Sequence, residues 1–352
     1  MKARIVIGSN YGDEGKGTVV ANYTKGAENV LNILTNGGAQ RGHSILTKDG
    51  SITFQHFGSG TYHGADTYYS RYFILNPMQF VREYETLIVK PKHIFRDGAC
   101  MWSTPYDSMA NLISEQQKGR HASCCMGIWN TIKRYKTMAT MTFDNFLSGE
   151  SAPHYLKLVK QYYERNLTIP EEWKATWDSP GIVSHFIEDC KFMAERTTVC
   201  GLPTLNYDEL IFENGQGLLL CDTGKDTYDT TPSNTGIIYA LTMLKEMGVD
   251  DITAHYVTRP YLTRHGDGYL FNETARGIVS SGVAEDRTNH FNEFQGGFRY
   301  GLLDIGSLRD RIVKDARGVD FELEVTHCDE MDRTSEFKKL FEKVNVYDSP
   351  LV

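Results

Sequence analysis

Short apolar runs separated by amphipathic stretches dominate the pattern of this chain. Apolar and β-branched runs predict strands at residues 4–7, 30–34, 51–55, 72–75, 210–213, 252–257, 321–326 and 344–346. Stretches with helical spacing predict helices at 18–23, 78–86, 156–166, 184–196 and 237–247. Asn76 and Pro77 mark the start of the second of these helices, and Pro170 and Pro180 separate the third from the fourth. Strands and helices therefore alternate along most of the chain.

This alternation is typical of an α/β fold. We expect a mostly parallel central sheet flanked by helices, with ligands bound beyond the carboxyl ends of the strands. No repeat, low-complexity tract or linker is evident in the 352 residues, and that length is sufficient for a large core. The prediction is one elaborated domain spanning residues 1–352.

Composition narrows the class of protein. Hydrophobic residues make up 40% of the chain and charged residues 23%, as in soluble globular proteins. The net charge of −8 disfavours a nucleic-acid partner, and no apolar run has the length of a membrane span. We expect no signal peptide, because residues 1–4 lead directly into a strand. The seven scattered cysteines indicate reduced thiols, and the adjacent Cys124 and Cys125 have no second Cys or His pair at a zinc-like spacing.

The run from Gly8 to Thr18 follows the first predicted strand and has the character of a phosphate-binding loop. Its glycines let backbone N–H groups approach phosphate oxygens, Lys16 supplies positive charge, and a helix that begins here would point its positive end at the ligand. The common phosphate-loop motif requires Gly at position 10 and Ser or Thr at position 17, whereas this chain has Asn10 and Gly17. An acid, Asp13, also lies inside the loop. We therefore predict a nucleotide-phosphate site with chemistry of its own.

Two further glycine-containing loops follow predicted strands. Residues 36–44 contain His43, a candidate general acid whose ordinary pKa suits neutral pH; the alternative is a glycine-rich turn with a surface histidine. Residues 214–217 contain Gln216, which could donate to a developing oxyanion, and hydroxyls at 230–235 could bind phosphate. The alternatives here are a β-turn and a helix N-cap at Ser233 or Asn234.

Several motifs, in order along the chain, resemble those of the adenylosuccinate synthetase family. They are Gly-Asp-Glu-Gly-Lys-Gly at 12–17, Gly-His-Ser at 42–44, Phe-Glu-Asn-Gly-Gln-Gly at 212–217, Thr-Pro-Ser-Asn-Thr at 231–235, Tyr-Leu-Thr-Arg-His-Gly-Asp-Gly at 261–268 and Val-Thr-His-Cys-Asp at 325–329. The first motif is highly specific, and the set covers most of the chain. The resemblance implies the family's nucleotide-binding core, which is similar to that of phosphate-loop proteins.

The resemblance also implies a two-step ligase. Asp13 would remove the N1 proton of a 6-oxopurine so that O6 attacks the γ-phosphoryl group of a nucleoside triphosphate, and His43 would act as an acid. The amine of L-aspartate would then displace phosphate from C6. Lys16 would neutralise charge on the transferred group, and Gln216 would hold O6. Mg²⁺ would bind the Asp13 carboxylate and the Gly42 carbonyl together with triphosphate oxygens, as a hard cation prefers.

By the same resemblance, further residues are expected to contact the ligands. The catalytic set is Asp13, His43, Lys16 and Gln216. The triphosphate-binding set is Asn10, Gly12, Glu14, Gly15, Lys16, Gly17, Thr18, Gly42, His43, Ser44 and Asp329. The set expected to bind the acceptor nucleotide is Asp13, Gln40, Ser123, Cys124, Gln216, Thr231 and His265. The aspartate-binding set is Phe294, Gln295, Gly296, Gly297 and Arg299.

Departures from the family pattern bear on the identity of the acceptor nucleotide. Residues 123–128 read Ser-Cys-Cys-Met-Gly-Ile where the family has Thr-Thr-Gly-Arg-Gly-Ile, and in the aspartate loop at 292–301 only Arg299 is kept. An arginine near the substrate ribose aligns with Gly296, a loss that a deoxyribose would permit. With the short length, these changes resemble the phage PurZ-type branch, which joins L-aspartate to dGMP to give N6-succino-2-amino-2′-deoxyadenylate for 2-aminoadenine DNA.

Two alternatives to dGMP ligation stay open. Some phage members replace the catalytic Asp by Ser, whereas Asp13 is present here, so ordinary adenylosuccinate synthesis from IMP is one alternative. The other, of a different class, is a non-catalytic nucleotide-binding regulator. The intact Asp13, His43 and Gln216 argue against that second alternative.

The donor, the oligomeric state and the compartment are also expectations from the resemblance. Thr-His-Cys-Asp at 326–329 replaces the guanine-selecting Thr-Lys-x-Asp, so ATP or dATP is expected rather than GTP. Asp329 contacts the donor base or is merely a residue at a strand end. A homodimer is expected from the resemblance. No residue aligns cleanly with the arginine that crosses the family's interface, and Arg134 and Lys136 are the nearest cations. The expected compartment is the cytoplasm, that of an infected host cell if a phage encodes the chain.

Overall fold

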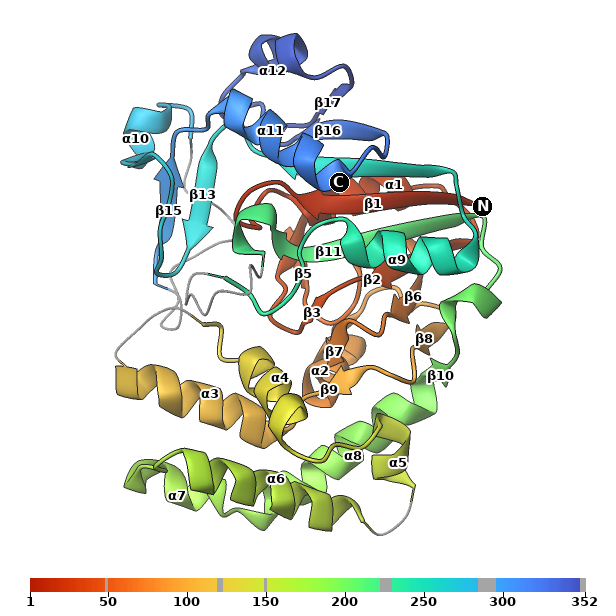
Figure 1. Cartoon of the computed structure of the whole chain (residues 1–352), viewed down its shortest axis with the longest axis vertical. Coiled ribbons are helices and arrows are strands. Elements are labelled where there is room, and N and C mark those ends of the chain that lie inside the picture. The colour runs from red at the N-terminus through yellow and green to blue at the C-terminus, as the bar shows by residue number, and fades with distance from the viewer. Residues whose placement is uncertain (48–49, 119–122, 149–150, 222–229, 284–295, 349–352) are drawn as a thin grey trace.

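A nine-stranded parallel sheet forms the centre of the molecule (Figure 1). The computed structural model describes residues 1–352 except 48–49, 119–122, 149–150, 222–229, 284–295 and 349–352. The strand order is β10-β8-β6-β2-β11-β1-β12-β16-β17, and each pairing in it is parallel. The strands are β1 (Lys2–Gly8), β2 (Val30–Leu34), β6 (Asp66–Tyr69), β8 (Ile94–Arg96), β10 (Thr198–Val199), β11 (Glu209–Gly217), β12 (Ile252–Thr258), β16 (Phe321–Val325) and β17 (Val344–Val346). The expected α/β sheet flanked by helices is confirmed.

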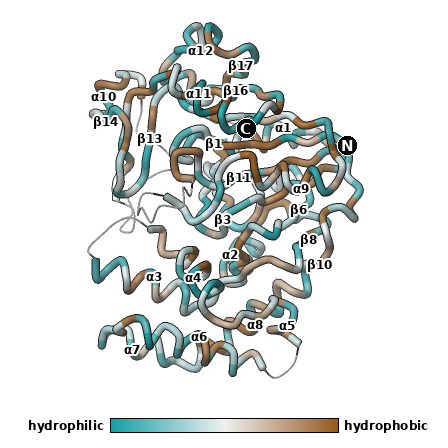
Figure 2. Tube along the Cα trace, viewed as in Figure 1, coloured by the Kyte–Doolittle hydropathy of each residue, from teal (hydrophilic) through white to brown (hydrophobic). Residues whose placement is uncertain are grey.

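Helices cover both faces of the sheet, which explains why central strands such as β1 and β2 are rich in apolar residues buried on both faces. In β1, Ile5 belongs to a core cluster shared with α9 (Ile238–Met247) and α11 (Ile305–Ala316). The next residue, Val6, packs on the opposite face with Val19 of α1 (Lys16–Thr24). Side chains alternate along a strand, so neighbouring apolar residues serve two separate cores. Figure 2 shows hydrophobic residues along these central strands.

A second layer, made mostly of helices, lies below the sheet in Figure 1. It packs around its own apolar cluster, in which Trp102 contacts Phe146 at a ring-centroid distance of 4.6 Å. Its helices are α2 (Pro77–Thr86), α3 (Pro105–Lys118), α4 (Ile128–Thr137), α5 (Phe143–Leu147), α6 (Ala152–Asn166), α7 (Glu171–Trp177) and α8 (Pro180–Arg196). Asn76 caps α2 by accepting a hydrogen bond from the Gln79 N–H, as its sequence position predicts.

Three small sheets depart from the sequence-based expectation. The strand predicted at 72–75 is β7 (Phe73–Leu75), which pairs with β3 (Gly37–Gly38) and β9 (Met101–Trp102) outside the central sheet. The strand predicted at 51–55 forms an antiparallel hairpin, β4 (His43–Thr47) with β5 (Gly50–Phe54). A third sheet contains β13 (Leu262–His265), β15 (Phe298–Gly301) and β14 (Glu273–Thr274), next to α10 (Arg276–Val279). The remaining short elements are η1 (Ser59–His63), η2 (Leu202–Thr204), η3 (Leu218–Leu220) and α12 (Thr334–Leu340).

The parallel sheet places the segments after β1, β2, β11, β12 and β16 at one edge, because strands that run the same way end on the same side. These are the glycine loops and the Val-Thr-His-Cys-Asp segment singled out by the sequence. Within the described ranges, no helix combines the length and apolarity needed to cross a bilayer.

Candidate active site

The loop after β1 closes tightly on the strand that carries Gln216. A Cβ added to Gly8 would lie 2.5 Å from Glu14 Oε2, 2.7 Å from the Gln216 carbonyl oxygen and 2.9 Å from Lys16 Nζ. Only glycine permits that approach, so Gly8 sets the distance between the two loops. Helix α1 begins at Lys16 after Gly15, whose φ of 89° is in the left-handed region. The predicted loop and helix are therefore both present.

The loop is folded around its own carboxylate. Glu14 Oε1 accepts hydrogen bonds from the N–H groups of Asn10 and Gly12, both at 2.9 Å, and Glu14 Oε2 lies 3.6 Å from Lys16 Nζ. Burial raises the pKa of Glu14, although Lys16 opposes the shift, and burial lowers the pKa of Lys16. The sequence predicts that these N–H groups face a phosphate. In the structure two of them instead donate to the carboxyl group of Glu14.

Unpaired buried atoms mark where a ligand would be held in this loop. Glu14 Oε2 and Thr18 Oγ1 are buried and have no hydrogen-bond partner among the described residues. Such atoms are costly unless a ligand, ion or water pairs with them, so they are informative about what binds. Their position at the start of α1 fits a polar, charged ligand.

Asp13, inside the first loop, lies next to the small sheet of β13, β14 and β15. Its backbone oxygen accepts a hydrogen bond from Arg259 Nε at 2.7 Å, and its carboxylate Oδ2 lies 3.8 Å from His265 Nδ1. The His265 ring packs on Phe298, with ring centroids 4.7 Å apart, and its Nε2 is buried without a partner among the described residues. The sheet of β13, β14 and β15 therefore supplies one wall of the site.

His43 is held by a buried carboxylate that the sequence interpretation did not assign. His43 Nδ1 lies 2.5 Å from Glu213 Oε1, and Arg41 Nη2 is 2.9 Å from the same oxygen. Ser59 donates to Glu213 through both its hydroxyl, at 2.7 Å, and its N–H, at 2.9 Å. Although burial alone would raise it, the Arg41 charge and the hydrogen bonds from His43 and Ser59 lower the pKa of Glu213 to about 2. Glu213 is therefore ionised and fixes the imidazole.

The protonation state of His43 differs from the sequence-based expectation. Burial, and then the Arg41 charge, lower the pKa of His43 to about 3, although Glu213 opposes the shift. The ring is therefore neutral at pH 7, with its Nδ1 proton directed at Glu213. The sequence-based premise of an imidazole pKa near neutrality is wrong, because the sequence does not reveal that His43 is buried beside an arginine.

Gln216 and Gln40 meet at Gly37. A Cβ on Gly37 would lie 3.3 Å from Gln216 Oε1 and 3.5 Å from Gln40 Nε2, and Gln40 Nε2 donates to Thr231 Oγ1 at 3.2 Å. Gln216 has a left-handed φ of 57°, and its Oε1 is buried without a partner among the described residues. Three predicted acceptor-binding residues are thus brought together around one glycine.

Two of the structural alternatives for this region are wrong. Residues 214–217 are not a separate turn, because β11 continues through Gly217. Neither Ser233 nor Asn234 caps a helix, because the N-cap of α9 is Ile237 and it has no side-chain cap. The Ser233 hydroxyl instead accepts a hydrogen bond from Asn36 Nδ2 at 3.1 Å.

Other residues predicted to contact the ligands have no described contact with the residues around Gly37. Ser123 donates to Asn111 Oδ1 on α3 at 3.1 Å, and burial raises the pKa of the Cys124 thiol. Neither has a described contact with Gln40, Gln216 or Thr231, so their role stays a prediction. Asp329 is exposed in the turn that follows β16.

The aspartate-loop prediction falls partly outside the described residues, because Phe294 and Gln295 are not described. Among the described residues, no atom lies within 4 Å of the position that a Cβ would take on Gly296 or Gly297. Arg299 pairs with Glu273 through Nε and Nη2, and its Nη1 donates to the carbonyls of Gly266 and Gly268 at 2.9 and 2.8 Å. All three of its nitrogens are engaged, so Arg299 would have to exchange partners to bind a free carboxylate.

Arg134 does not lie where an interface arginine is needed. It is fully buried, and Nε and Nη2 donate to the two Asp107 oxygens at 2.9 Å each. The Tyr163 hydroxyl donates to the same carboxylate at 2.5 Å. Arg134, one of the two cations nearest in sequence to the family's interface arginine, therefore has its guanidinium committed to the interior of its own helical layer.

Some residues of the site were missed by sequence analysis. Arg311 supports the first loop by donating to the Ser9 carbonyl at 2.8 Å and to Asn10 Oδ1 at 2.6 Å. Thr326 donates to the Glu14 carbonyl at 2.7 Å. Glu213 and Arg41 lie inside motifs that the sequence singled out, but their partners are distant in the chain. Arg311 carries no local signal.

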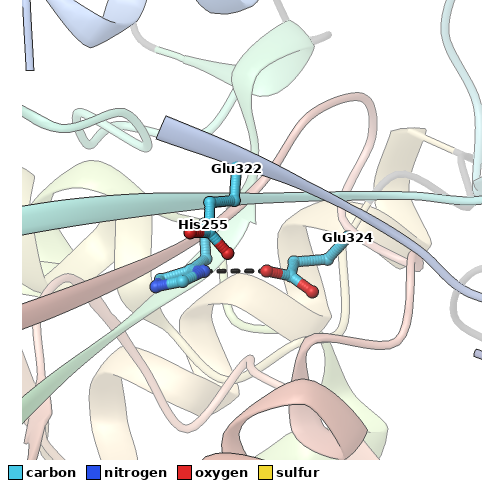
Figure 3. Close-up of side chains that lie close together, drawn as sticks. All are labelled: His255, Glu322 and Glu324. Atoms are coloured by element: carbon cyan, nitrogen blue, oxygen red, sulfur yellow. Dashed lines mark hydrogen bonds and ion pairs between the residues drawn. The ribbon is translucent and has the colours of Figure 1, made fainter. Parts of the chain in front are cut away.

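A cluster of possible metal ligands within the described residues, His255, Glu322 and Glu324, lies on the neighbouring strands β12 and β16 (Figure 3). His255 Nδ1 lies 2.7 Å from Glu324 Oε1. Glu324 also accepts hydrogen bonds from Tyr23 at 2.8 Å and Tyr347 at 2.7 Å, besides the amide of Asn345. Because its oxygens are already paired with donors, this cluster is a hydrogen-bonded network within the sheet.

Glu83 supports the segment that precedes Ser59. Its carboxylate accepts hydrogen bonds from the N–H groups of Gln55, His56 and Phe57 at 3.0, 2.6 and 3.0 Å. Burial outweighs these bonds and raises the pKa of Glu83 from 4.5 to about 7. The segment that leads to Ser59, and so to Glu213, depends on a carboxyl group that titrates near neutral pH.

Glu83 is expected to make the protein less stable as the pH rises. Below pH 4.5 it is protonated in both states; between pH 4.5 and 7 only the unfolded chain releases the proton, so the free energy of unfolding falls by up to about 3 kcal/mol. Denaturant unfolding from pH 4 to 8 would compare the wild type with Glu83→Gln, in which this loss is absent. Glu85→Gln, an exposed change on the same helix, is the control, and equal pH slopes for the wild type and Glu83→Gln would contradict the prediction.

Comparison with known protein families gives a match over most of the chain. The family model described as adenylosuccinate synthetase matches residues 5–339. The adenylosuccinate synthetase of Finegoldia magna is 24% identical over 347 residues, which cover 89% of this chain and 76% of that protein. The one from Geotalea uraniireducens is 26% identical over 287 residues, covering 75% of this chain but 63% of its own length.

Two solved structures share the fold. The fully ligated adenylosuccinate synthetase of Plasmodium falciparum superposes with a TM-score of 0.74 at 17% identity, covering 95% of this chain and 78% of that one. The succinoaminodeoxyadenylate synthetase (PurZ) of cyanophage S-2L, bound to dGMP and to dATP as an energy donor, gives a TM-score of 0.67 at 12% identity and covers 99% and 92%.

Proposed function

Because this chain belongs to the adenylosuccinate synthetase family, whose members are C–N ligases, we propose that it joins L-aspartate to C6 of dGMP at the expense of a nucleoside triphosphate. The observation that carries the proposal is the close packing at Gly8, where Glu14, Lys16 and the Gln216 backbone meet. This packing brings the loop with the candidate base, Asp13, next to the strand with the candidate O6 ligand, Gln216. The product would be N6-succino-2-amino-2′-deoxyadenylate.

The first chemical step would be phosphoryl transfer to O6. Asp13 removes the N1 proton, the electron pair moves to O6, and O6 bonds to the γ-phosphorus while the nucleoside diphosphate leaves. Gln216 holds O6, and Lys16 neutralises charge on the transferred group. The triphosphate's negative charge would favour a protonated His43, which then donates from Nε2, since Nδ1 is held by Glu213.

The second step would be displacement at C6. The neutral amine of L-aspartate bonds to C6, the C6–O6 bond breaks, and phosphate leaves and takes up the proton that the amine loses. Gly296, Gly297 and Arg299 are the described residues proposed to lie near the amino acid, and Arg299 would first have to release Glu273. Ser123, Cys124, Gln40, Thr231 and His265 are proposed to bind the acceptor nucleotide.

Mg²⁺ is the metal that this reaction implies, and the oxygen donors of the loops fit it. Asp13 is a partly exposed carboxylate with a long described contact to His265, and the exposed Gly42 lies beside His43. Hard cations prefer such carboxylate and carbonyl oxygens, so Asp13 and Gly42 are the proposed ligands. When bound, the ion would withdraw charge from the triphosphate oxygens.

The choice of dGMP has two supports. The cyanophage structure is bound to dGMP and dATP. In this chain a glycine, Gly296, aligns with the family's arginine near the ribose, a loss that a deoxyribose would permit. The sequence relatives are named adenylosuccinate synthetases, which favours IMP as the alternative acceptor. ATP or dATP is the proposed donor, ahead of GTP. We also propose one domain over residues 1–352, a homodimer, and a cytoplasmic location, in an infected host cell if a phage encodes the chain.

A matrix of acceptors against donors tests the proposal. The protein with L-aspartate and Mg²⁺ is incubated with IMP, dIMP, GMP or dGMP, each with ATP, dATP or GTP, and the succino product is measured by mass spectrometry. We expect the highest turnover with dGMP and an adenine donor. Product from IMP and none from dGMP would contradict the acceptor and support ordinary adenylosuccinate synthesis. Tight binding without turnover of any acceptor would support a regulator instead.

A further inference from the structure

Arg41 is a buried arginine whose hydrogen bonds do not compensate for the desolvation of its guanidinium. It is 2% exposed, and its Nε and Nη1 atoms have no hydrogen-bond partner among the described residues. Burying a guanidinium is expensive unless its donors are paired, so this arrangement is poor as a stabilising device. Departures of this kind are expected where a residue serves a site.

The contacts that Arg41 does make lead to the proposed reaction centre. Its Nη2 lies 2.9 Å from Glu213 Oε1 and 3.0 Å from His43 Nδ1, so the three groups form a compact triangle. The short His43–Glu213 distance places the Nδ1 proton between those two groups, and Arg41 donates to the carboxylate. The described hydrogen bonds of His43 all involve Nδ1, which leaves Nε2 for a ligand.

The aliphatic stem of Arg41 packs on the other side of the centre. A Cβ added to Gly215 would lie 3.1 Å from Arg41 Cγ and 3.4 Å from Arg41 Cδ, so this stem rests directly on the backbone of β11. Gly215 immediately precedes Gln216, whose strained backbone φ of 57° needs support from its surroundings. One side chain thus contacts both the strand of Gln216 and the anchor of His43.

Other charged and polar groups complete the surroundings of this cluster. Lys16 on α1 acts on His43 through its charge, and Glu83 on α2 and Tyr69 on β6 act on Arg41 in the same way. Ser59 from η1 occupies both oxygens of Glu213. No second carboxylate is hydrogen-bonded to Arg41 within the described part of the chain, so Glu213 is the partner through which it acts.

We propose that Arg41 is a positioning residue, which aligns the His43 imidazole through Glu213 and the Gln216 backbone through Gly215. This inference deepens the proposed function, on which its kinetic test rests. In this role the guanidinium charge pairs with the Glu213 carboxylate, and the aliphatic stem packs on the backbone of β11 at Gly215.

Measurements of kcat and Tm on the same variants distinguish a positioning role of Arg41 from a role limited to neutralising the charge of Glu213. In Arg41→Met the stem is kept but the charge that pairs Glu213 is lost, so kcat is expected to fall about 10–10²-fold, with each KM within threefold of the wild type. The double variant Arg41→Met with Glu213→Gln removes both charges, so it should recover the Tm lost in Arg41→Met without recovering kcat. Arg41→Lys keeps a positive charge, so its kcat should lie between those of Arg41→Met and the wild type. Recovery of kcat together with Tm in the double variant would overturn the proposal.

A spectroscopic measurement tests the inference even if the proposed substrates are wrong. The wild-type protein without ligands should show a slowly exchanging His43 Nδ1 proton in imidazole-selective NMR, because that proton is buried against Glu213. Arg41→Met should lose or shift this resonance, whereas Arg71→Met, a change at a partly exposed arginine paired with Glu246, should not. An unchanged His43 resonance in Arg41→Met would refute the positioning role, and absent ligation with a changed resonance would refute only the proposed function.

Discussion

Asp13→Asn is expected to reduce ligation by about 10²–10⁴-fold, the usual range for removal of a general base. The amide has nearly the shape of the carboxylate but cannot take the N1 proton, and it is a weaker metal ligand. The Asp13 backbone contact to Arg259 does not involve the side chain, so the loop should keep its fold. Steady-state kinetics with dGMP, L-aspartate, Mg²⁺ and ATP measures the loss, and circular dichroism with thermal unfolding checks the fold.

A matched change elsewhere isolates the role of Asp13. Asp208 is an exposed aspartate immediately before β11, at the opposite end of that strand from Gln216, and it pairs with Asn29 at 3.1 Å. Asp208→Asn should leave turnover within twofold of the wild type. Full activity in Asp13→Asn would remove this residue from the mechanism, and the base would have to be sought elsewhere.

Arg134→Met is expected to destabilise the protein by about 3–5 kcal/mol, because it leaves the buried Asp107 carboxylate without its cation. Asp107 and Arg134 are both inaccessible to solvent, and their paired contacts are 2.9 Å each. The Tyr155 hydroxyl and the Trp102 carbonyl also lose their donor, at 3.0 and 2.9 Å. Equilibrium unfolding in denaturant, monitored by tryptophan fluorescence, measures the change in the free energy of unfolding.

The exposed Lys136 on the same helix is the natural control. Lys136→Met should change the free energy of unfolding by no more than about 0.5 kcal/mol, as surface changes usually do. If Arg134→Met instead kept full stability and weakened only subunit association or nucleotide binding, Arg134 would have to reach outward after all.

Much of the central sheet was predictable because its signal is local. Strands β1, β2, β11, β12, β16 and β17 lie in the predicted positions, because strands covered on both faces are rich in apolar residues. Strand β6 was missed because it reads Asp-Thr-Tyr-Tyr. Its Asp66 is acceptable in a buried strand because His93 N–H and the Tyr207 hydroxyl donate to it, and those partners are remote in sequence.

Helices, like strands, were predictable only where their signal is local. The helix predicted at 184–196 begins earlier, at Pro180, because proline is well suited to the first position of a helix and does not only separate elements. Helix α11 was not predicted, although it carries Arg311, which braces the first loop. Its place over the sheet depends on Leu308 and Ile312 meeting the apolar face of strands far away in the chain.

For the candidate site, the sequence by itself determined the residue types, because glycines, an acid and a lysine directly after an apolar strand have few uses other than holding phosphate. It also led to the family, to which the chain belongs. The tertiary structure alone decided how these groups are paired: Glu14 occupies the loop N–H groups, Arg134 is buried with Asp107, and Arg41 and Glu213 hold His43. The reason is physical. A local pattern reports burial and backbone preference, whereas the pairing of His43 with Glu213, 170 residues apart in the chain, exists only after the parallel strands have brought their carboxyl ends to one edge.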